Sequence, residues 1–270
     1  MSDHDDFGGI SRDLPRLLGR RRLLGLLAGG AAATLAAACT SGPAGSSSTG
    51  SSSTGSSSGA SAASGAGAIP AETGGPYPAD GSNGPNVLDD AGIVRSDIRS
   101  SFGSSTTTAH GVPLRIELTL TDTAGAALPG AAVYVWHCDR EGRYSLYSRG
   151  ATGENYLRGV QAADPAGKVS FTSIFPACYQ GRWPHVHFEV YRSLADATSS
   201  GNAVRTTQLA LPKETCEAVY ATDGYAASVR TLAQVSLASD MVFRDGWDRQ
   251  LATVTGDVTS GFTASLPVVV

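Results

Sequence analysis

The stretch "KVSFTSIFPACYQGRWPHVHFEVY", residues 168–191, contains two runs in which apolar and polar side chains alternate, separated by two prolines and a glycine. Successive side chains of a β-strand point to opposite faces, so alternation with a period of two predicts strands. Similar runs, rich in Val, Thr, Ile, Leu and aromatic residues, recur from residue 114 onward. The predicted strands are 114–122, 131–138, 168–175, 185–191, 204–211, 251–258 and 262–270.

Turn-forming residues fill the gaps between these runs, as in "DTAGAALPG" (122–130) and "ADPAGK" (163–168). A helix is predicted at 212–221, because it opens on a proline and is followed by "TDGY", and a second helix at 226–233. The sequence therefore predicts an all-β fold: an antiparallel β-sandwich with one or two short helices.

The N-terminal region has the order of an export signal. The stretch "GRRRLLGLLAGGAAATLAAAC", residues 19–39, passes from arginines through an uncharged apolar run to small residues. It resembles a twin-arginine signal, which we assign to residues 1–38. "LAAAC" also resembles a lipoprotein processing site with Cys39 as the lipid-bearing residue, and the alternative is cleavage near Ala38 and release. The expected location is the outer face of the cytoplasmic membrane or the extracellular space.

Residues 39–69 are dominated by Ser, Gly, Thr and Ala. Such a composition offers little apolar surface to offset the conformational entropy lost on folding, so it predicts a flexible tether. The remaining segment, 70–270, is long enough for one hydrophobic core and is the predicted catalytic domain.

Composition excludes some classes of function. The net charge is −4 and 16% of residues are charged, which argues against a nucleic-acid-binding protein. No other apolar run is long enough to cross a bilayer, so membrane contact is expected only through a lipid anchor. Pairing among Cys138, Cys178 and Cys216 stays open, as does the oligomeric state.

Two histidines in the quoted stretch point to a metal site. On an extended strand His185 and His187 face the same side, so both imidazoles can reach one ion. This pattern alone also fits an ordinary half-buried strand.

Two tyrosines strengthen the metal hypothesis. Tyr179 lies in a loop before the histidine strand, and a turn after the strand 131–138 presents Tyr144, with Tyr147 as a rival. A phenol has a pKa of about 10, so a phenolate ligand needs a strong Lewis acid. Two phenolates with two imidazoles favour iron(III) over zinc.

Other polar residues near these motifs have simpler interpretations. His137 is interpreted as a structural histidine, and residues 139–141 as a solvated turn. Tyr77 is expected near the mouth of the pocket.

The motifs "ETGGPYPADGSNG" (72–84), "VWHCDREGRYSLY" (135–147), "YLRGVQAADPAGKVSFTSIFPACYQGRWPHVHFEVY" (156–191) and "TTQLALP" (206–212) follow one another in a familiar order. Together they resemble the intradiol ring-cleavage dioxygenases, the non-haem iron(III) family that includes catechol and protocatechuate 3,4-dioxygenases. The exported, single-domain branch of that family is the most similar.

The resemblance implies a site, a cofactor and a reaction. Iron(III) would cleave catechol-type substrates with O2 to cis,cis-muconate-type diacids, with Tyr179 leaving the metal to take up a substrate proton. The implied metal ligands are Tyr144, Tyr179, His185 and His187, and the implied catalytic residues are Arg182, Gln208 and Tyr179.

Alternatives remain at this stage. Arg182 fits a solvated loop charge, and Gln208 fits a side chain that bonds only to backbone. The whole domain fits a catalytically inactive exported binding module, for example for carbohydrate. The same ligands also suit copper or zinc in a hydrolytic reaction.

Overall fold

The computed structural model describes residues 67–270, so the predicted export signal, Cys39 and most of the predicted tether lie outside the described residues. Ile69, the last residue assigned to the tether, is 2% exposed, and its N–H donates to the Val269 carbonyl at 2.8 Å.

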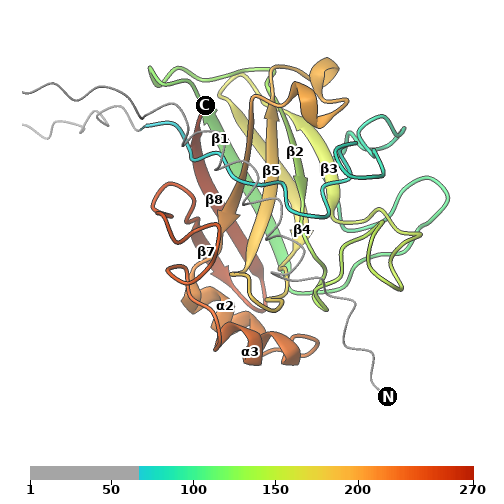
Figure 1. The fold of residues 1–270 in the computed structure, drawn as a ribbon, viewed down its shortest axis with the longest axis vertical. Coiled ribbons are helices and arrows are strands. Elements are labelled where there is room, and N and C mark those ends of the chain that lie inside the picture. Colours follow the sequence, from blue (N-terminus) through green and yellow to red (C-terminus); the bar gives the residue numbers. More distant parts are fainter. Residues whose placement is uncertain (1–66) are drawn as a thin grey trace, which may run out of the picture.

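Within residues 67–270, eight strands form two four-stranded sheets that pack against each other (Figure 1). The first sheet has the order β4-β1-β8-β7 and the second β3-β2-β5-β6. Their bounds are β1 Pro113–Thr121, β2 Ala132–Trp136, β3 Arg158–Ala162, β4 Lys168–Ile174, β5 His185–Tyr191, β6 Arg205–Ala210, β7 Thr253–Asp257 and β8 Gly261–Val269. The predicted all-β sandwich is confirmed.

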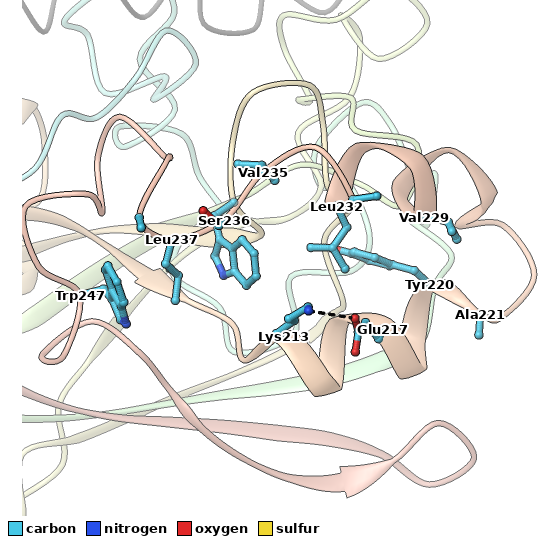
Figure 2. Close-up of a pocket in the computed structure, with 13 residues that line it drawn as sticks. Lys213, Glu217, Tyr220, Ala221, Val229, Leu232, Val235, Ser236, Leu237 and Trp247 are labelled. Atoms are coloured by element: carbon cyan, nitrogen blue, oxygen red, sulfur yellow. Dashed lines mark ion pairs between the residues drawn. The ribbon is translucent and has the colours of Figure 1, made fainter.

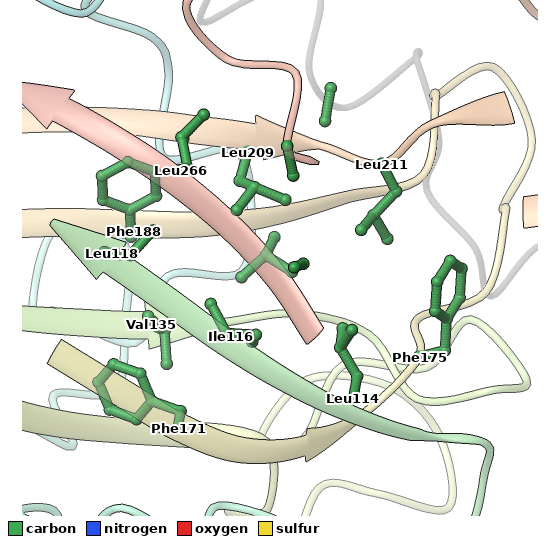
Figure 3. Close-up of a cluster of buried hydrophobic side chains, with 14 of the residues drawn as sticks. Leu114, Ile116, Leu118, Val135, Phe171, Phe175, Phe188, Leu209, Leu211 and Leu266 are labelled. Atoms are coloured by element: carbon green, nitrogen blue, oxygen red, sulfur yellow. The ribbon is translucent and has the colours of Figure 1, made fainter. Parts of the chain in front are cut away.

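The main core lies between the sheets (Figure 3). On β1 the alternating residues Leu114, Ile116 and Leu118 are at most 1% exposed, while their neighbours are more accessible. They meet side chains such as Val135 and Phe188 from the second sheet. Burying one apolar face of each sheet is what joins the two sheets into a sandwich.

One strand pair differs from the predicted antiparallel arrangement. β8 runs parallel to β1, with Leu114 opposite Phe262, while the other strand pairs in both sheets are antiparallel. The cause is the connection: after β6 the chain passes through two helices to the β7–β8 hairpin, whose second strand enters the first sheet alongside β1.

Both predicted helices are present, as α2 (Lys213–Tyr220) and α3 (Ala226–Leu232), and they lie together at one end of the sandwich (Figure 1). Two short 3₁₀ turns, Leu194–Asp196 and Ser200–Asn202, were not predicted. Within residues 67–270 no helix has the length and apolar character needed to cross a membrane.

Strand β3 was also not predicted. Its sequence, RGVQA, has no clean alternation, and it is a strand because it pairs with β2, placing Arg158 opposite Trp136. Tertiary pairing therefore overrides a weak local signal.

Candidate metal centre

The candidate site lies on the outer face of the second sheet. Along β5, Val186 and Phe188 point into the main core, so His185 and His187 point to the opposite face. A second group of buried side chains, including Tyr134 and residues from the 79–93 segment, covers that face. All seven residues of β5 are consequently buried, although only one face belongs to the sandwich core.

The structure brings together the four side chains predicted as metal ligands. The Tyr144 and Tyr179 phenolic oxygens lie 3.5 Å apart. The Tyr179 oxygen is 3.2 Å from His185 Nε2, which in turn is 3.0 Å from His187 Nε2. Tyr144 and both histidines are buried, and Tyr179 is partly exposed. Two oxygen and two nitrogen donors thus converge at one place.

The hydrogen bonds of the two histidines indicate which of their nitrogens are available to a cation. His185 Nδ1 lies 2.5 Å from the Trp183 carbonyl, which can only accept, so Nδ1 carries the proton and Nε2 presents a lone pair. His187 Nδ1 is buried without a hydrogen-bond partner among the described residues. If His187 carries its proton there, two Nε2 lone pairs face each other at 3.0 Å. A cation between the two nitrogens would remove that repulsion.

Burial sets the charge of these groups. It lowers the pKa of His185 to about 3 and that of His187 well below the usual range, so both imidazoles are neutral at pH 7 and can act as ligands. Burial raises the pKa of the Tyr144 phenol well above its usual range, so its ionisation requires a nearby positive charge. No group of three or more His, Cys, Asp or Glu suited to a metal occurs within residues 67–270. The two oxygen donors of this site are phenolic, and ionised phenols suit a hard trivalent ion.

Aromatic rings hold two of the four donors in place. The Trp136 ring stacks on His187, with centroids 5.0 Å apart and planes 5° apart, and the two residues are opposite each other on β2 and β5. Tyr77, expected near the mouth of the pocket, packs on Tyr144 with ring centroids 4.8 Å apart.

Arg182 and Gln208 lie beside the donors and contact each other. Arg182 is 1% exposed, and its Nη2 donates to Gln208 Oε1 at 2.6 Å, so the interpretation of Arg182 as a solvated charge is wrong. Gln208 Nε2 donates to the Thr73 carbonyl at 2.9 Å, and Gln208 is opposite His187 in the sheet register. Gln208 therefore bonds both to backbone and to Arg182.

Sequence reasoning missed Asp240, which is fully buried and accepts a hydrogen bond from Arg182 Nε at 3.0 Å. It lies in the irregular segment between α3 and β7, where no alternation, spacing or motif identifies a buried carboxylate. Only the position of Arg182 in three dimensions reveals its partner.

The rival candidates have other roles. The Tyr147 hydroxyl donates to Asn83 Oδ1 and accepts from the Ala79 N–H, both at 2.9 Å, and it is not among the converging donors. His137 Nε2 lies 2.7 Å from Ser173 Oγ and its Nδ1 lies 2.8 Å from the Cys138 carbonyl. The interpretation of His137 as a structural histidine is confirmed.

The interpretation of residues 139–141 as a solvated turn is wrong at its first residue. Asp139 is 2% exposed, and its carboxylate accepts from Arg143 Nε at 2.9 Å and from the Tyr156 hydroxyl at 3.0 Å. The Asp139 carboxylate also accepts hydrogen bonds from backbone N–H groups of the turn that leads to Tyr144. The three cysteines of the described residues are buried and unpaired: Cys138, Cys178 and Cys216.

An apolar cavity of about 830 Å³ lies between α2, α3 and the segment after α3, and none of the four donors lines it (Figure 2). Trp183 and Trp247 line it, and the Lys213–Glu217 ion pair, 3.5 Å between Nζ and Oε1, lies beside it. Trp183 links the cavity to the donors, because its carbonyl is the partner of His185 Nδ1.

The fold and the donor set together define a β-sandwich protein with a candidate mononuclear metal centre. Comparison with known proteins places the chain more narrowly, since a family model described as "Dioxygenase" matches residues 83–195. That segment includes all four donors and Arg182, but neither Gln208 nor Asp240. The matched segment, residues 83–195, belongs to this dioxygenase family, and the predicted resemblance to the intradiol ring-cleavage dioxygenases is confirmed.

Two curated relatives show the extent of the sequence similarity. The chain is 34% identical over 88 residues to catechol 1,2-dioxygenase of Pseudomonas sp. (strain EST1001), covering 33% of this chain and 26% of that protein. It is 33% identical over 67 residues to chlorocatechol 1,2-dioxygenase of Rhodococcus opacus, covering 25% of this chain and 26% of that protein. The chain thus spans about a quarter of the length of these relatives.

Among solved structures, the fold is similar to an intradiol ring-cleavage dioxygenase from Tetranychus urticae. The TM-score is 0.55 at 22% identity, covering 67% of this chain and 87% of that chain. This similarity supports the β-sandwich fold.

Proposed function

We propose that this protein is an iron(III)-dependent intradiol dioxygenase that opens the ring of catechol-type aromatics with O2. The carbon–carbon bond between the two hydroxylated carbons breaks, and both oxygen atoms enter the product, a cis,cis-muconate-type diacid. Family membership and the similarity to catechol and chlorocatechol 1,2-dioxygenases support the reaction class.

The convergence of two phenolic oxygens and two imidazole nitrogens carries the proposal. Tyr144, Tyr179, His185 and His187 would hold the ion. Iron(III), when bound, supplies a Lewis acid that favours ionised phenols and an ionised catechol and makes the ring reactive toward O2.

The remaining roles follow from burial and position. Tyr179 is the more exposed of the two tyrosines, so its phenolic oxygen is the group that receives a proton from a catechol hydroxyl. His185 keeps its proton on Nδ1, held by the Trp183 carbonyl. The Arg182 guanidinium, aligned by Gln208, stabilises negative charge that develops on the substrate. A preorganised donor of this kind contributes on the order of 3 kcal/mol.

The test uses the purified protein loaded with iron(III). We expect a red-brown colour from tyrosinate-to-iron charge transfer, and uptake of one O2 per catechol. With ¹⁸O₂, mass spectrometry should find two labelled oxygens in the diacid. A colourless protein that takes up no oxygen with a panel of catechols would instead favour a binding module.

Tyr144 and Tyr147 provide a matched pair of variants. Tyr144→Phe removes a converging oxygen, so the charge-transfer band should weaken and kcat should fall by at least about 10²-fold. Tyr147→Phe removes a hydroxyl that bonds to Asn83 and Ala79, away from the donors, so colour and kcat should stay close to wild type. The reverse pattern would show that the ligand is Tyr147.

A further inference from the structure

Asp240 is a fully buried carboxylate on which four donors converge. Its Oδ2 accepts from Arg182 Nε at 3.0 Å and from the Trp183 backbone N–H at 2.7 Å. Its Oδ1 accepts from the N–H groups of Val242 and Phe243, at 2.8 and 3.2 Å. These contacts anchor the segment after α3 to the residues that directly precede His185.

Both groups held by Oδ2 lead to the site. Arg182 continues to Gln208 through Nη2, at 2.6 Å. Trp183 continues to His185, because its carbonyl accepts from the imidazole Nδ1. A single oxygen atom of Asp240 therefore fixes the guanidinium and the backbone that orients one of the donors.

We propose that Asp240 is a positioning residue for ring cleavage: its carboxylate fixes the Arg182 guanidinium against Gln208. The proposal rests on the proposed function. Asp240 lies outside the matched family segment 83–195.

The physical reason is the cost of leaving Arg182 without its anion. Arg182 and Asp240 are 1% and 0% exposed, so water cannot replace a lost partner. An arginine whose Nε–H is no longer held can change rotamer, and a shift of about 1 Å in a charge-stabilising group can lower the rate about 10²-fold. A group that acts mainly on charge developing during the reaction affects kcat more than KM.

The first test is Asp240→Asn in the iron-loaded protein. We expect kcat to fall by about 10²-fold, with KM within about 2-fold of wild type. Iron content and the charge-transfer band should persist, because none of the four donors is removed. Ile116→Ala is the control, since it destabilises the sandwich core without contacting the site and should keep the wild-type kcat.

The second test is a double-mutant cycle with Arg182→Gln. If Asp240 acts through Arg182, Asp240→Asn should lower kcat by less than about 2-fold in the Arg182→Gln background. Thermal unfolding of the metal-free proteins gives an independent readout, because each single variant leaves one buried charge without its opposite charge. The double variant should therefore unfold at a higher temperature than the single variants. Should Asp240→Asn alone fail to fold, the double variant is compared with Arg182→Gln.

Two results would overturn the proposal: an Asp240→Asn protein with kcat within 2-fold of wild type, or equal losses of kcat in both backgrounds. A different result identifies failure of the proposed function. Iron-loaded wild type that takes up no oxygen with any catechol contradicts ring cleavage, and with it any role of Asp240 in that reaction. The thermal cycle on the metal-free proteins then still decides whether Asp240 and Arg182 are coupled.

Discussion

Arg158 tests how the chain segments around Tyr77 and Ser145 are held over the candidate metal centre. Although 1% exposed, its guanidinium donates to the Tyr77, Pro78 and Ser145 carbonyls at 2.9 Å. It also donates to the Tyr134 hydroxyl and to Ser145 Oγ at 3.0 Å. Arg158→Met keeps much of the apolar stem and removes these five contacts.

The expected cost follows from the acceptors left behind. Pro78 keeps the Tyr134 hydroxyl as a donor, at 2.7 Å, whereas the Tyr77 and Ser145 carbonyls lose the guanidinium. A buried acceptor without a partner costs about 1–3 kcal/mol, and the Tyr77 carbonyl is only partly buried, so the two together predict a loss of about 3 kcal/mol in the free energy of unfolding. For a domain of this size the melting temperature should fall by about 10 °C.

The site should also respond, because Tyr77 packs on Tyr144 and Ser145 is its chain neighbour. We therefore expect Arg158→Met to lower kcat as well as stability. Urea unfolding followed by tryptophan fluorescence measures the stability. The control is Arg99→Met, whose salt bridge to Asp97 is exposed and should contribute less than about 1 kcal/mol. Equal unfolding midpoints for the two variants would refute the reasoning.

Two further variants test burial on either side of the second sheet. Burial raises the pKa of Glu189 from 4.5 to about 7; the hydrogen bond from Tyr191 opposes this shift and the charge of Asp80 reinforces it. The contribution of Glu189 to the free energy of unfolding is therefore fully present below pH 4.5 and is lost as the pH rises through 7. Urea unfolding between pH 4.5 and 8 should show wild type losing about 3 kcal/mol more than Glu189→Gln, whereas the exposed Glu217→Gln should follow wild type. In the main core, Ile116→Ala should lower the free energy of unfolding by about 3 kcal/mol, measured in the same way, and an unchanged midpoint would contradict its burial.

The fold was largely predictable because apolar and polar side chains alternate along most of the strands. Alternation identified β1, β4, β5 and β8 to within a residue or two, since each has one face in the core. β3 escaped because its register comes from β2 rather than from its own pattern. The parallel pairing of β1 and β8 was equally hidden, because alternation carries no information about strand direction.

Some residues of the candidate site were also predictable from a local pattern, and others were not. His185 and His187 could be paired from their spacing on one strand, but the convergence of Tyr144 with Tyr179 required the family resemblance. The two tyrosines approach from different loops, and no local pattern relates them. The buried carboxylates Asp139 and Asp240 were missed because a polar residue in irregular sequence looks solvated until its three-dimensional partners are known.

The need for Asp240 can be understood from the fields acting on His185. Burial is the main cause that lowers the pKa of this imidazole, and the Arg182 guanidinium lowers it further, whereas the Asp240 carboxylate raises it. A buried guanidinium without a counter-charge is also costly to desolvate, and the Asp240 carboxylate, 0% exposed, offsets that cost. A buried site that keeps an arginine for substrate charge therefore needs an anion close to the guanidinium but outside the donor set. The chain places that anion 58 residues from Arg182, in a segment that becomes part of the site only when the sandwich has formed.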